Sequence, residues 1–224
     1  MEVGRSIPRV DAADKVTGRA KYTDDLCPRP VLEAKILHST IANGVVKSID
    51  TSEAEKIPGV VKIVTCFDVP QYKFPTAGHP WCTDPAHQDV ADRLLLTSRV
   101  RYYGDDVAAV IAEDEIAANR AVRAIKAEYE EYPFVLDQLE AMKDGAPLVH
   151  DEYKNNILAH TSMKKGDYEE AIKEDGLIKF EGWYDTPTVQ HCHMENFICF
   201  AYEEAGRIVV VSSTQIPHIV RRIV

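Results

Sequence analysis

One segment restricts the possible folds more than any other, because it places a one-sided helix between strand-like stretches. Residues 114–128 carry apolar side chains at a spacing that predicts a single apolar stripe along a helix. The stripe consists of Ala118, Ala121, Val122 and Ile125. Residues 100–113, broken at Gly104, predict a strand pair or one long bent strand, and residues 129–135 predict another strand. A helix with one apolar stripe must pack it against a neighbour, so the chain belongs to the α/β or α+β class.

The rest of the chain also alternates between strand-like and helix-like stretches. Strands are expected over residues 31–40, 45–50, 60–66, 156–164, 177–185, 197–203 and 207–213. Short helices are expected over residues 53–57, capped by Thr51 or Ser52, and over residues 167–174. Residues 216–224 begin a helix that stops in mid-pattern, so we expect the chain to end inside a domain.

These elements and the changes in composition between them predict four parts. Residues 1–25 have little periodicity and predict an extended N-terminal arm. Residues 26–136 form a first domain of strands and a helix, and residues 137–155 form a connector with one short helix. Residues 156–224 begin a second domain.

Composition excludes several classes of partner. A formal net charge of −10 argues against nucleic acid and against an anionic membrane, since either would need clustered Lys and Arg. The best apolar runs, Val107–Ala112 and Ile208–Val211, have the length of buried strands and are too short to span a membrane. The polar start after Met1 does not resemble a secretory signal, so we expect a cytoplasmic protein.

The cysteines indicate neither an iron–sulfur cluster nor a set of disulfide bonds. There are five, widely spread and without a Cys-x-x-Cys pair: Cys27, Cys66, Cys82, Cys192 and Cys199. An iron–sulfur cluster needs several thiolates close together, so we expect this chain to hold none. We expect all five to be reduced thiols, mostly buried.

The segment Gln190-His191-Cys192-His193-Met194-Glu195 is the densest group of chemically active side chains. If it is extended, the period of two places His191, His193 and Glu195 on one face. Two imidazoles and a carboxylate on one side imitate a non-haem iron or catalytic zinc site. The alternative interpretation is structural, with these polar groups, Gln190 included, held by hydrogen bonds at a junction.

Residues 67–98 form a long irregular stretch, and long loops in compact domains are often functional. One interpretation is that this stretch forms the wall of a binding pocket through its segment Gly78-His79-Pro80-Trp81. Trp81 would then give a flat apolar face to an aromatic ligand. The other interpretation is a covering loop whose aromatic side chains pin it to its own domain. Asp105-Asp106 after Gly104 predicts a turn rather than a pair of catalytic carboxylates.

Several common active-site motifs are missing from the sequence. It contains no Gly-x-Gly-x-x-Gly, no Walker loop and no Gly-x-Ser-x-Gly. The residues alone therefore predict an α/β or α+β protein without a complete active site, and we assign no catalytic residue and no metal ligand.

Motifs spread along the whole chain resemble the start of the large subunits of the xanthine dehydrogenase and aldehyde oxidase family, and most closely its bacterial members. The motifs that carry the resemblance to the family's α/β hammerhead domain are Val3–Ala12, Lys15–Gly18, Tyr22–Asp25, Pro58–Val60, Asp68–Pro70, Tyr103–Ala108 and Tyr129–Pro133. Those that resemble the opening of its molybdopterin-binding domain are Gln190–Glu195 and Ser212–Gln215. The resemblance implies an α+β fold, with a hammerhead domain over residues 26–136 and the incomplete start of a mixed α/β molybdopterin-binding domain over residues 156–224.

The resemblance also implies an activity for the whole protein. Members of the family hydroxylate xanthine, hypoxanthine or a related N-heterocycle at carbon, with oxygen taken from water. They use molybdenum held by molybdopterin cytosine dinucleotide, and electrons leave through [2Fe–2S] clusters and FAD, here expected on partner subunits. The partners implied are those subunits and the rest of the molybdopterin domain, and a homo-oligomer is compatible with the resemblance.

The family's glycine-rich cofactor loop, its substrate-orienting Glu and Arg, and its catalytic Glu all lie beyond the position of Val224. We therefore expect this chain alone to be inactive and to bind none of these cofactors. By the resemblance, Gln190, His191, His193 and Glu195 form a structural motif, and Gly78, His79 and Trp81 approach the substrate funnel. The alternatives are a non-catalytic binding or assembly module of the hammerhead fold, or a small metalloprotein that uses His191, His193 and Glu195.

Overall fold

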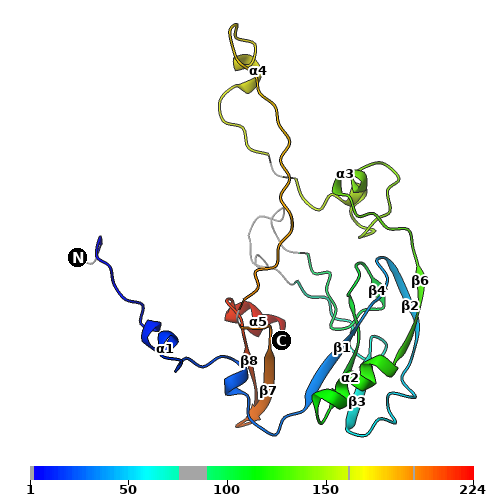
Figure 1. The fold of residues 1–224 in the computed structure, drawn as a ribbon. Helices are drawn as coiled ribbons and strands as arrows, with labels where there is room; N and C mark the ends of the chain where they lie inside the picture. Colours follow the sequence, from blue (N-terminus) through cyan, green and yellow to red (C-terminus); the bar gives the residue numbers. More distant parts are fainter. Residues whose placement is uncertain (1–2, 76–89, 161, 194) are drawn as a thin grey trace. The chain divides into compact units, whose positions relative to one another are not determined.

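The computed structural model describes residues 3–75, 90–160, 162–193 and 195–224. The chain divides into two compact units, which are described separately. The larger unit contains Leu32–Lys179 with Ile223, and the smaller unit contains Met1–Val31 and Phe180–Arg222 with Val224. Figure 1 gives the order of the elements along the chain. In the described part of the chain, no helix is both long enough and apolar enough to cross a membrane.

The larger unit contains two three-stranded antiparallel sheets, ordered β1-β5-β3 and β4-β2-β6. The strands are β1 (Glu33–His38), β2 (Gly44–Asp50), β3 (Val60–Thr65), β4 (Arg99–Val100), β5 (Asp106–Ala112) and β6 (Lys126–Glu131). In the register of the first sheet, Ala109 of β5 lies opposite Ile36 on one side and Val64 on the other. β5 is therefore the middle strand and is hydrogen-bonded along both edges.

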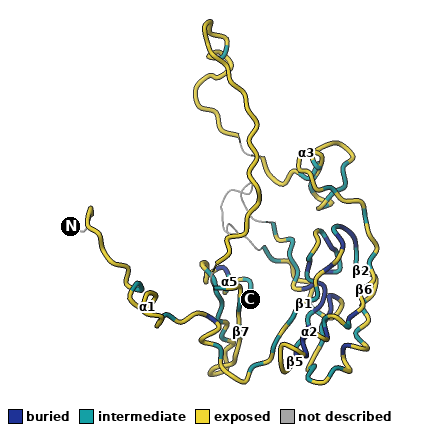
Figure 2. Tube along the Cα trace, in the orientation of Figure 1, coloured by how far each residue is buried: buried dark blue, intermediate teal, exposed yellow. Residues whose placement is uncertain are grey.

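β5 is also buried on both faces, as its apolar sequence predicts. Val107 packs in one cluster with Val46 and Val100, which belong to the other sheet. Val110 packs in a second cluster with Ala121 and Ile125. Figure 2 shows the buried residues gathered in this part of the chain, around β5 and α2. The core of the larger unit thus lies on the two sides of one strand.

Helix α2 (Glu115–Ala124) follows β5 directly and confirms the strongest helix expected from the sequence. Asp114 caps it, because its carboxylate accepts a hydrogen bond of 2.7 Å from the Ala117 N–H. The helix ends earlier than expected, since the backbone of Ile125 is extended (φ −67°, ψ 136°). The following residues then alternate as strand β6, with Ala127 and Tyr129 half-buried between exposed charged neighbours. The strand expected over residues 129–135 therefore begins and ends earlier.

Most other expected elements are confirmed with small shifts at their ends. β1, β2 and β3 match the first three expected strands of the larger unit. In the connector, α3 (Gln138–Ala141) is the expected short helix, and η3 (Lys154–Asn156) is an additional 3-10 turn. α4 (Tyr168–Ala171) confirms the short helix expected over residues 167–174.

Four expectations are wrong. Residues 53–57 form turns rather than a helix, and the Thr51 hydroxyl bonds the Glu55 carboxylate instead of capping. The residues 100–113 form neither a strand pair nor one bent strand, because β4 and β5 join different sheets. Residues 156–160, 162–164 and 177–185 are not strands, because among the described residues no strand pairs with any of these segments. An apolar or alternating pattern needs such a partner before it becomes a strand.

The smaller unit is built on a two-stranded hairpin. β7 (Cys199–Glu204) pairs with β8 (Arg207–Ser212) through the two-residue turn Ala205-Gly206, whose φ angles are both positive. Both strands confirm the expected ones. The unit also contains α1 (Ala12–Val16), η1 (Asp24–Leu26) and most of α5 (Pro217–Ile223), of which α5 was expected.

The cysteines of the described residues are free thiols, but most of them are not buried. Cys66 is buried, Cys27 is half-buried, and Cys192 and Cys199 are exposed. Burial raises the pKa of Cys66 to about 11, so this thiol stays protonated at neutral pH. The expectation of mostly buried thiols is therefore wrong for the described cysteines.

The Asp114 cap gives a direct test of how α2 is fixed. Replacing Asp114→Ala leaves the Ala117 N–H without its acceptor, so the free energy of unfolding should fall by about 1 kcal/mol. Asp114→Asn keeps an acceptor oxygen and should remain within about 0.3 kcal/mol of the parent chain. Urea unfolding followed by circular dichroism measures both, and equal losses in the two variants would contradict the capping role.

Candidate functional site

The candidate site lies at the end of the Gln190–Glu195 motif, just before β7. The hairpin register pairs Cys199 with Ser212, which brings the residues before β7 next to the residues after β8. The Ser213 hydroxyl fixes this junction, since it accepts a hydrogen bond from the Ile198 N–H at 3.2 Å and donates to the Asn196 carbonyl at 3.2 Å. The motif and the segment after β8 are thus neighbours because of the hairpin.

Glu195 is hydrogen-bonded to Thr23, near the start of the chain. Its Oε1 accepts two hydrogen bonds from Thr23, one from the backbone N–H at 2.9 Å and one from the hydroxyl at 2.8 Å. Thr23 is buried and directly precedes η1, where a turn is closed by a bond from the Tyr22 N–H to Asp25. The two donors of Thr23 lower the pKa of the Glu195 carboxyl below its usual range, so it is ionised at neutral pH.

The two histidines of the motif do not form a metal site with Glu195. The His191 and His193 rings stack with centroids 5.2 Å apart, and His193 meets Phe197 edge-on. The backbone is not simply extended, because Cys192 has a positive φ of 53°. In the residues that the structure describes, no group of three or more His, Cys, Asp or Glu is placed to hold a metal ion. Gln190, His191 and His193 are exposed.

A hollow of about 360 Å³ opens beside Glu195. Its lining consists of Thr23, His193, Glu195, Phe197, Ser212, Ser213, Thr214 and Gln215. This lining contains hydroxyls, an imidazole, an amide and one carboxylate, and no Lys or Arg. The hollow is therefore polar and negatively charged, which suits hydrogen-bond donors better than anions.

The sequence motifs included Thr23 and Gln215 but gave neither a role in this hollow. Thr23 and Glu195 are 172 positions apart, so no local spacing could connect them. The one available signal was that both lie in motifs of the same family resemblance. Gly78, His79 and Trp81, the candidates from the long loop, lie outside the described residues.

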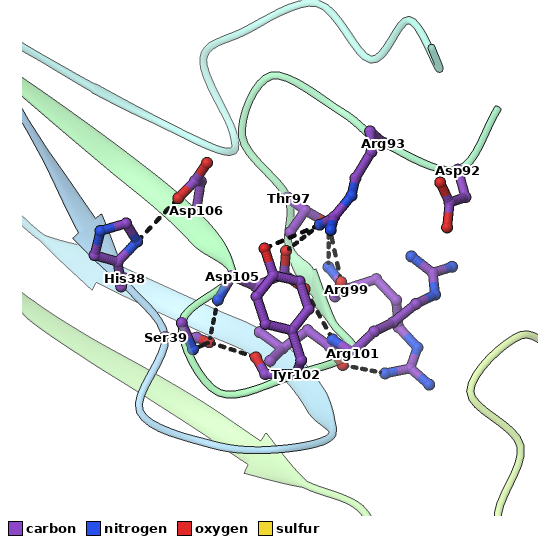
Figure 3. A network of polar contacts seen from close by, with 12 residues as sticks. His38, Ser39, Asp92, Arg93, Thr97, Arg99, Arg101, Tyr102, Asp105 and Asp106 are labelled. Carbon is purple, nitrogen blue, oxygen red and sulfur yellow. Dashed lines mark hydrogen bonds and ion pairs between the residues drawn. The ribbon is translucent and has the colours of Figure 1, made fainter. Parts of the chain in front are cut away.

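A second polar cluster lies in the larger unit, in the turn between β4 and β5 (Figure 3). The Asp105 carboxylate is almost fully buried and accepts from the Arg101 N–H at 2.9 Å and from Arg93 at 3.4 Å. Arg93 also bonds the Tyr102 hydroxyl at 3.0 Å and lies over its ring. Asp106 bonds His38 instead, so the two neighbouring carboxylates have separate partners and serve the turn, as expected.

Ser39 organises that turn from β1. Its buried hydroxyl accepts from the Asp105 N–H at 3.0 Å and from the Gly104 N–H at 3.2 Å, and it donates to the Tyr102 carbonyl at 3.1 Å. A hollow of about 570 Å³ opens beside the cluster, but each acidic group around it already has a partner. This cluster therefore fixes the backbone of the turn between β4 and β5. The hollow beside Glu195 is the better candidate for binding a ligand.

Comparison with known proteins finds both of the domains that the sequence motifs resemble. Residues 17–133 match the family described as "Aldehyde oxidase and xanthine dehydrogenase, a/b hammerhead domain". Residues 149–224 match the "Molybdopterin cofactor-binding domain". The chain belongs to the aldehyde oxidase and xanthine dehydrogenase family. The expected fold, a hammerhead domain followed by the start of a molybdopterin-binding domain, is confirmed.

Two curated relatives indicate where the chain stands within the xanthine dehydrogenase family. It is 44% identical over 217 residues to a xanthine dehydrogenase molybdenum-binding subunit of Escherichia coli O157:H7, covering 96% of this chain and 28% of the relative. It is 30% identical over 255 residues to a probable hypoxanthine oxidase of Escherichia coli K12, covering 98% of this chain and 26% of the relative. The chain thus spans less than a third of either relative.

Solved structures of the family share the same fold. The aldehyde oxidoreductase of Desulfovibrio desulfuricans is 30% identical, with a TM-score of 0.80 over 94% of this chain and 24% of that one. The quinoline 2-oxidoreductase of Pseudomonas putida is 26% identical, with a TM-score of 0.83 over 100% of this chain and 28% of that one.

The hollow by Glu195 fits one part of a molybdopterin cofactor. The Thr214 hydroxyl and the Gln215 amide suit the nitrogen- and oxygen-rich pterin, which is uncharged. The phosphates of such a cofactor need cationic side chains or clustered N–H donors, and the lining contains no cationic side chain. Within the described residues, this hollow can therefore meet the heterocyclic part of the cofactor and not its phosphates.

The turn between β4 and β5 should depend on Ser39. Ser39→Ala removes the closer of the two acceptors of the buried Asp105 N–H, which then keeps only the Tyr102 carbonyl at 3.3 Å, so the free energy of unfolding should fall by about 1 kcal/mol. Ser48→Ala is the matched control, because Ser48 is exposed on β2, and it should change stability by less than about 0.5 kcal/mol. Chemical denaturation of both variants provides the measurement, and similar values for the two would refute the role given to Ser39.

The contact between Thr23 and Glu195 should be pH-dependent. Because folding lowers the pKa of Glu195, its contribution is present above the pKa of the unfolded chain and is lost as the pH falls through the folded pKa. Hydrogen exchange should show the Thr23 N–H less protected in acid than at neutral pH. Glu195→Ala should lower that protection at neutral pH by about fivefold or more, whereas the exposed control Glu203→Ala should not. Equal protection in both variants would disprove the contact.

Proposed function

We propose that this chain forms part of the molybdenum-binding subunit of an enzyme that hydroxylates purines. The observation that carries the proposal is the 44% identity, over nearly the whole chain, to a protein named as a xanthine dehydrogenase molybdenum-binding subunit. The substrates would be xanthine, hypoxanthine or a related N-heterocycle. The hydroxylated carbon gains an oxygen from water, and two electrons and two protons leave.

In this proposal the chain supplies a scaffold and part of a binding surface. Glu195 holds the arm through Thr23, and the segment Ser213–Gln215 would meet the heterocyclic part of a molybdenum cofactor, in its cytosine dinucleotide form. The cofactor, when bound, supplies the redox centre of the reaction. Gln190, His191 and His193 remain structural members of the motif, and Gly78, His79 and Trp81 would line the path of the substrate.

The remaining components would come from outside this chain. The catalytic residues would lie in the rest of the subunit, and FAD and [2Fe–2S] clusters would be carried by partner subunits in the cytoplasm. The four-part division into residues 1–25, 26–136, 137–155 and 156–224 belongs to the same proposal. A small metalloprotein is the weaker alternative, because the described residues gather no metal-ligand group.

The proposal can be tested on the enzyme purified from its source with its partner subunits. We expect near-stoichiometric molybdenum by elemental analysis and oxidation of hypoxanthine or xanthine with an artificial electron acceptor. In H₂¹⁸O the product should carry the label, whereas ¹⁸O₂ as the matched control should leave it unlabelled. The 224-residue chain alone should show no turnover. Turnover by that chain alone, or a molybdenum-free complex, would refute the proposal.

A further inference from the structure

Only one of the two carboxylate oxygens of Glu195 is hydrogen-bonded to Thr23. Both hydrogen bonds from Thr23 end on Oε1. No described residue donates a hydrogen bond to Oε2, although Glu195 lines the hollow. A carboxylate oxygen accepts more than one hydrogen bond, so Oε2 has its full capacity left for a ligand.

Other groups of the lining leave ring surface and polar atoms open to a ligand. Phe197 is 81% exposed, so most of its ring is open to contact. The Thr214 hydroxyl is oriented by accepting a hydrogen bond of 3.1 Å from the Ile216 N–H. The Gln215 side-chain amide is exposed and forms no hydrogen bond to any described residue, which leaves both its donor and its acceptor for a ligand.

We propose that this hollow binds the N–H donor edge of a flat, uncharged heterocycle, with Glu195 as the acceptor that selects it. Glu195 Oε2 accepts from the ring N–H or amino group, the Gln215 amide bonds the neighbouring carbonyl, and the Phe197 ring packs against the ligand. The identity of the ligand rests on the proposed function, since the pterin of the cofactor and a purine both carry such an edge.

Charge gives the hollow its selectivity. Glu195 is ionised at neutral pH, as an ordinary glutamate is, and no Lys or Arg of the lining offsets that charge. An ionised carboxylate attracts N–H donors and repels phosphate or carboxylate groups. The hollow should therefore reject a pyrophosphate group while it accepts a neutral heterocycle.

Ligand-observed NMR titration of the full chain tests this selectivity with three probes: pterin, hypoxanthine and inorganic pyrophosphate. Pterin or hypoxanthine should bind, and pyrophosphate should not. Glu195→Gln removes the charge and should weaken heterocycle binding by about fivefold. The matched control Glu203→Gln, an exposed carboxylate on β7, should leave binding unchanged.

The outcomes separate the alternatives. The heterocycle that binds more tightly identifies the source of the ligand, cofactor or substrate. Pyrophosphate binding as tightly as the heterocycles, no heterocycle binding at all, or equal effects of Glu195→Gln and Glu203→Gln would overturn the inference. If circular dichroism shows that Glu195→Gln does not fold, Gln215→Leu replaces it, at an exposed position, with an expected loss of about threefold.

Failure of this inference can be told from failure of the proposed function. Binding in these titrations needs neither molybdenum nor turnover. A holoenzyme that oxidises purines while the chain binds heterocycles independently of Glu195 would reject the inference alone. Selective binding in a complex that holds no molybdenum would reject the proposed function alone.

Discussion

The larger unit depends on the burial of β5 from every side. Its two edges are hydrogen-bonded to β1 and β3, and its two faces pack against different groups, Val107 toward the second sheet and Val110 toward α2. Val107, Ala108, Val110 and Ala112 are fully buried and Ala109 and Ile111 are half-buried, so most apolar side chains of β5 contribute their full burial. The ends of β5 are then fixed by polar contacts, Asp105 with Ser39 at the start and Asp114 with α2 at the end. Both sheets and the helix take their positions from this strand.

This arrangement explains which elements the sequence could predict. A continuous apolar run and a helical stripe are local patterns, so β5 and α2 could be recognised. The end of α2 could not be recognised from the sequence. Ile125 continues the apolar stripe of the helix, but in the structure its backbone is extended and leads into β6, while its side chain still packs in the core. The segments 156–164 and 177–185 failed for another reason, since strand formation depends on a partner strand and not on their own pattern.

The candidate site, like the fold, could be predicted from the sequence only in part. The sequence could find the motif Gln190–Glu195, because its side chains are chemically dense. It could not assign the role of Glu195, which is decided by Thr23 at a distance of 172 residues along the chain. The metal interpretation also assumed an extended backbone, and the positive φ of Cys192 breaks that assumption. Local spacing thus located the site, and only tertiary contacts defined its chemistry.

The contact between Thr23 and Glu195 also limits what the motif can be. Two neutral donors of Thr23 approach one oxygen of the carboxylate, and the described residues gather no further metal-ligating side chains around it. His193 packs on His191 and Phe197 instead of turning its nitrogen toward a shared centre with Glu195. The negative charge therefore remains uncompensated by any cation of the lining and faces the hollow. A charge in that position acts on whatever ligand enters, which is the basis for our proposal that Glu195 selects the ligand.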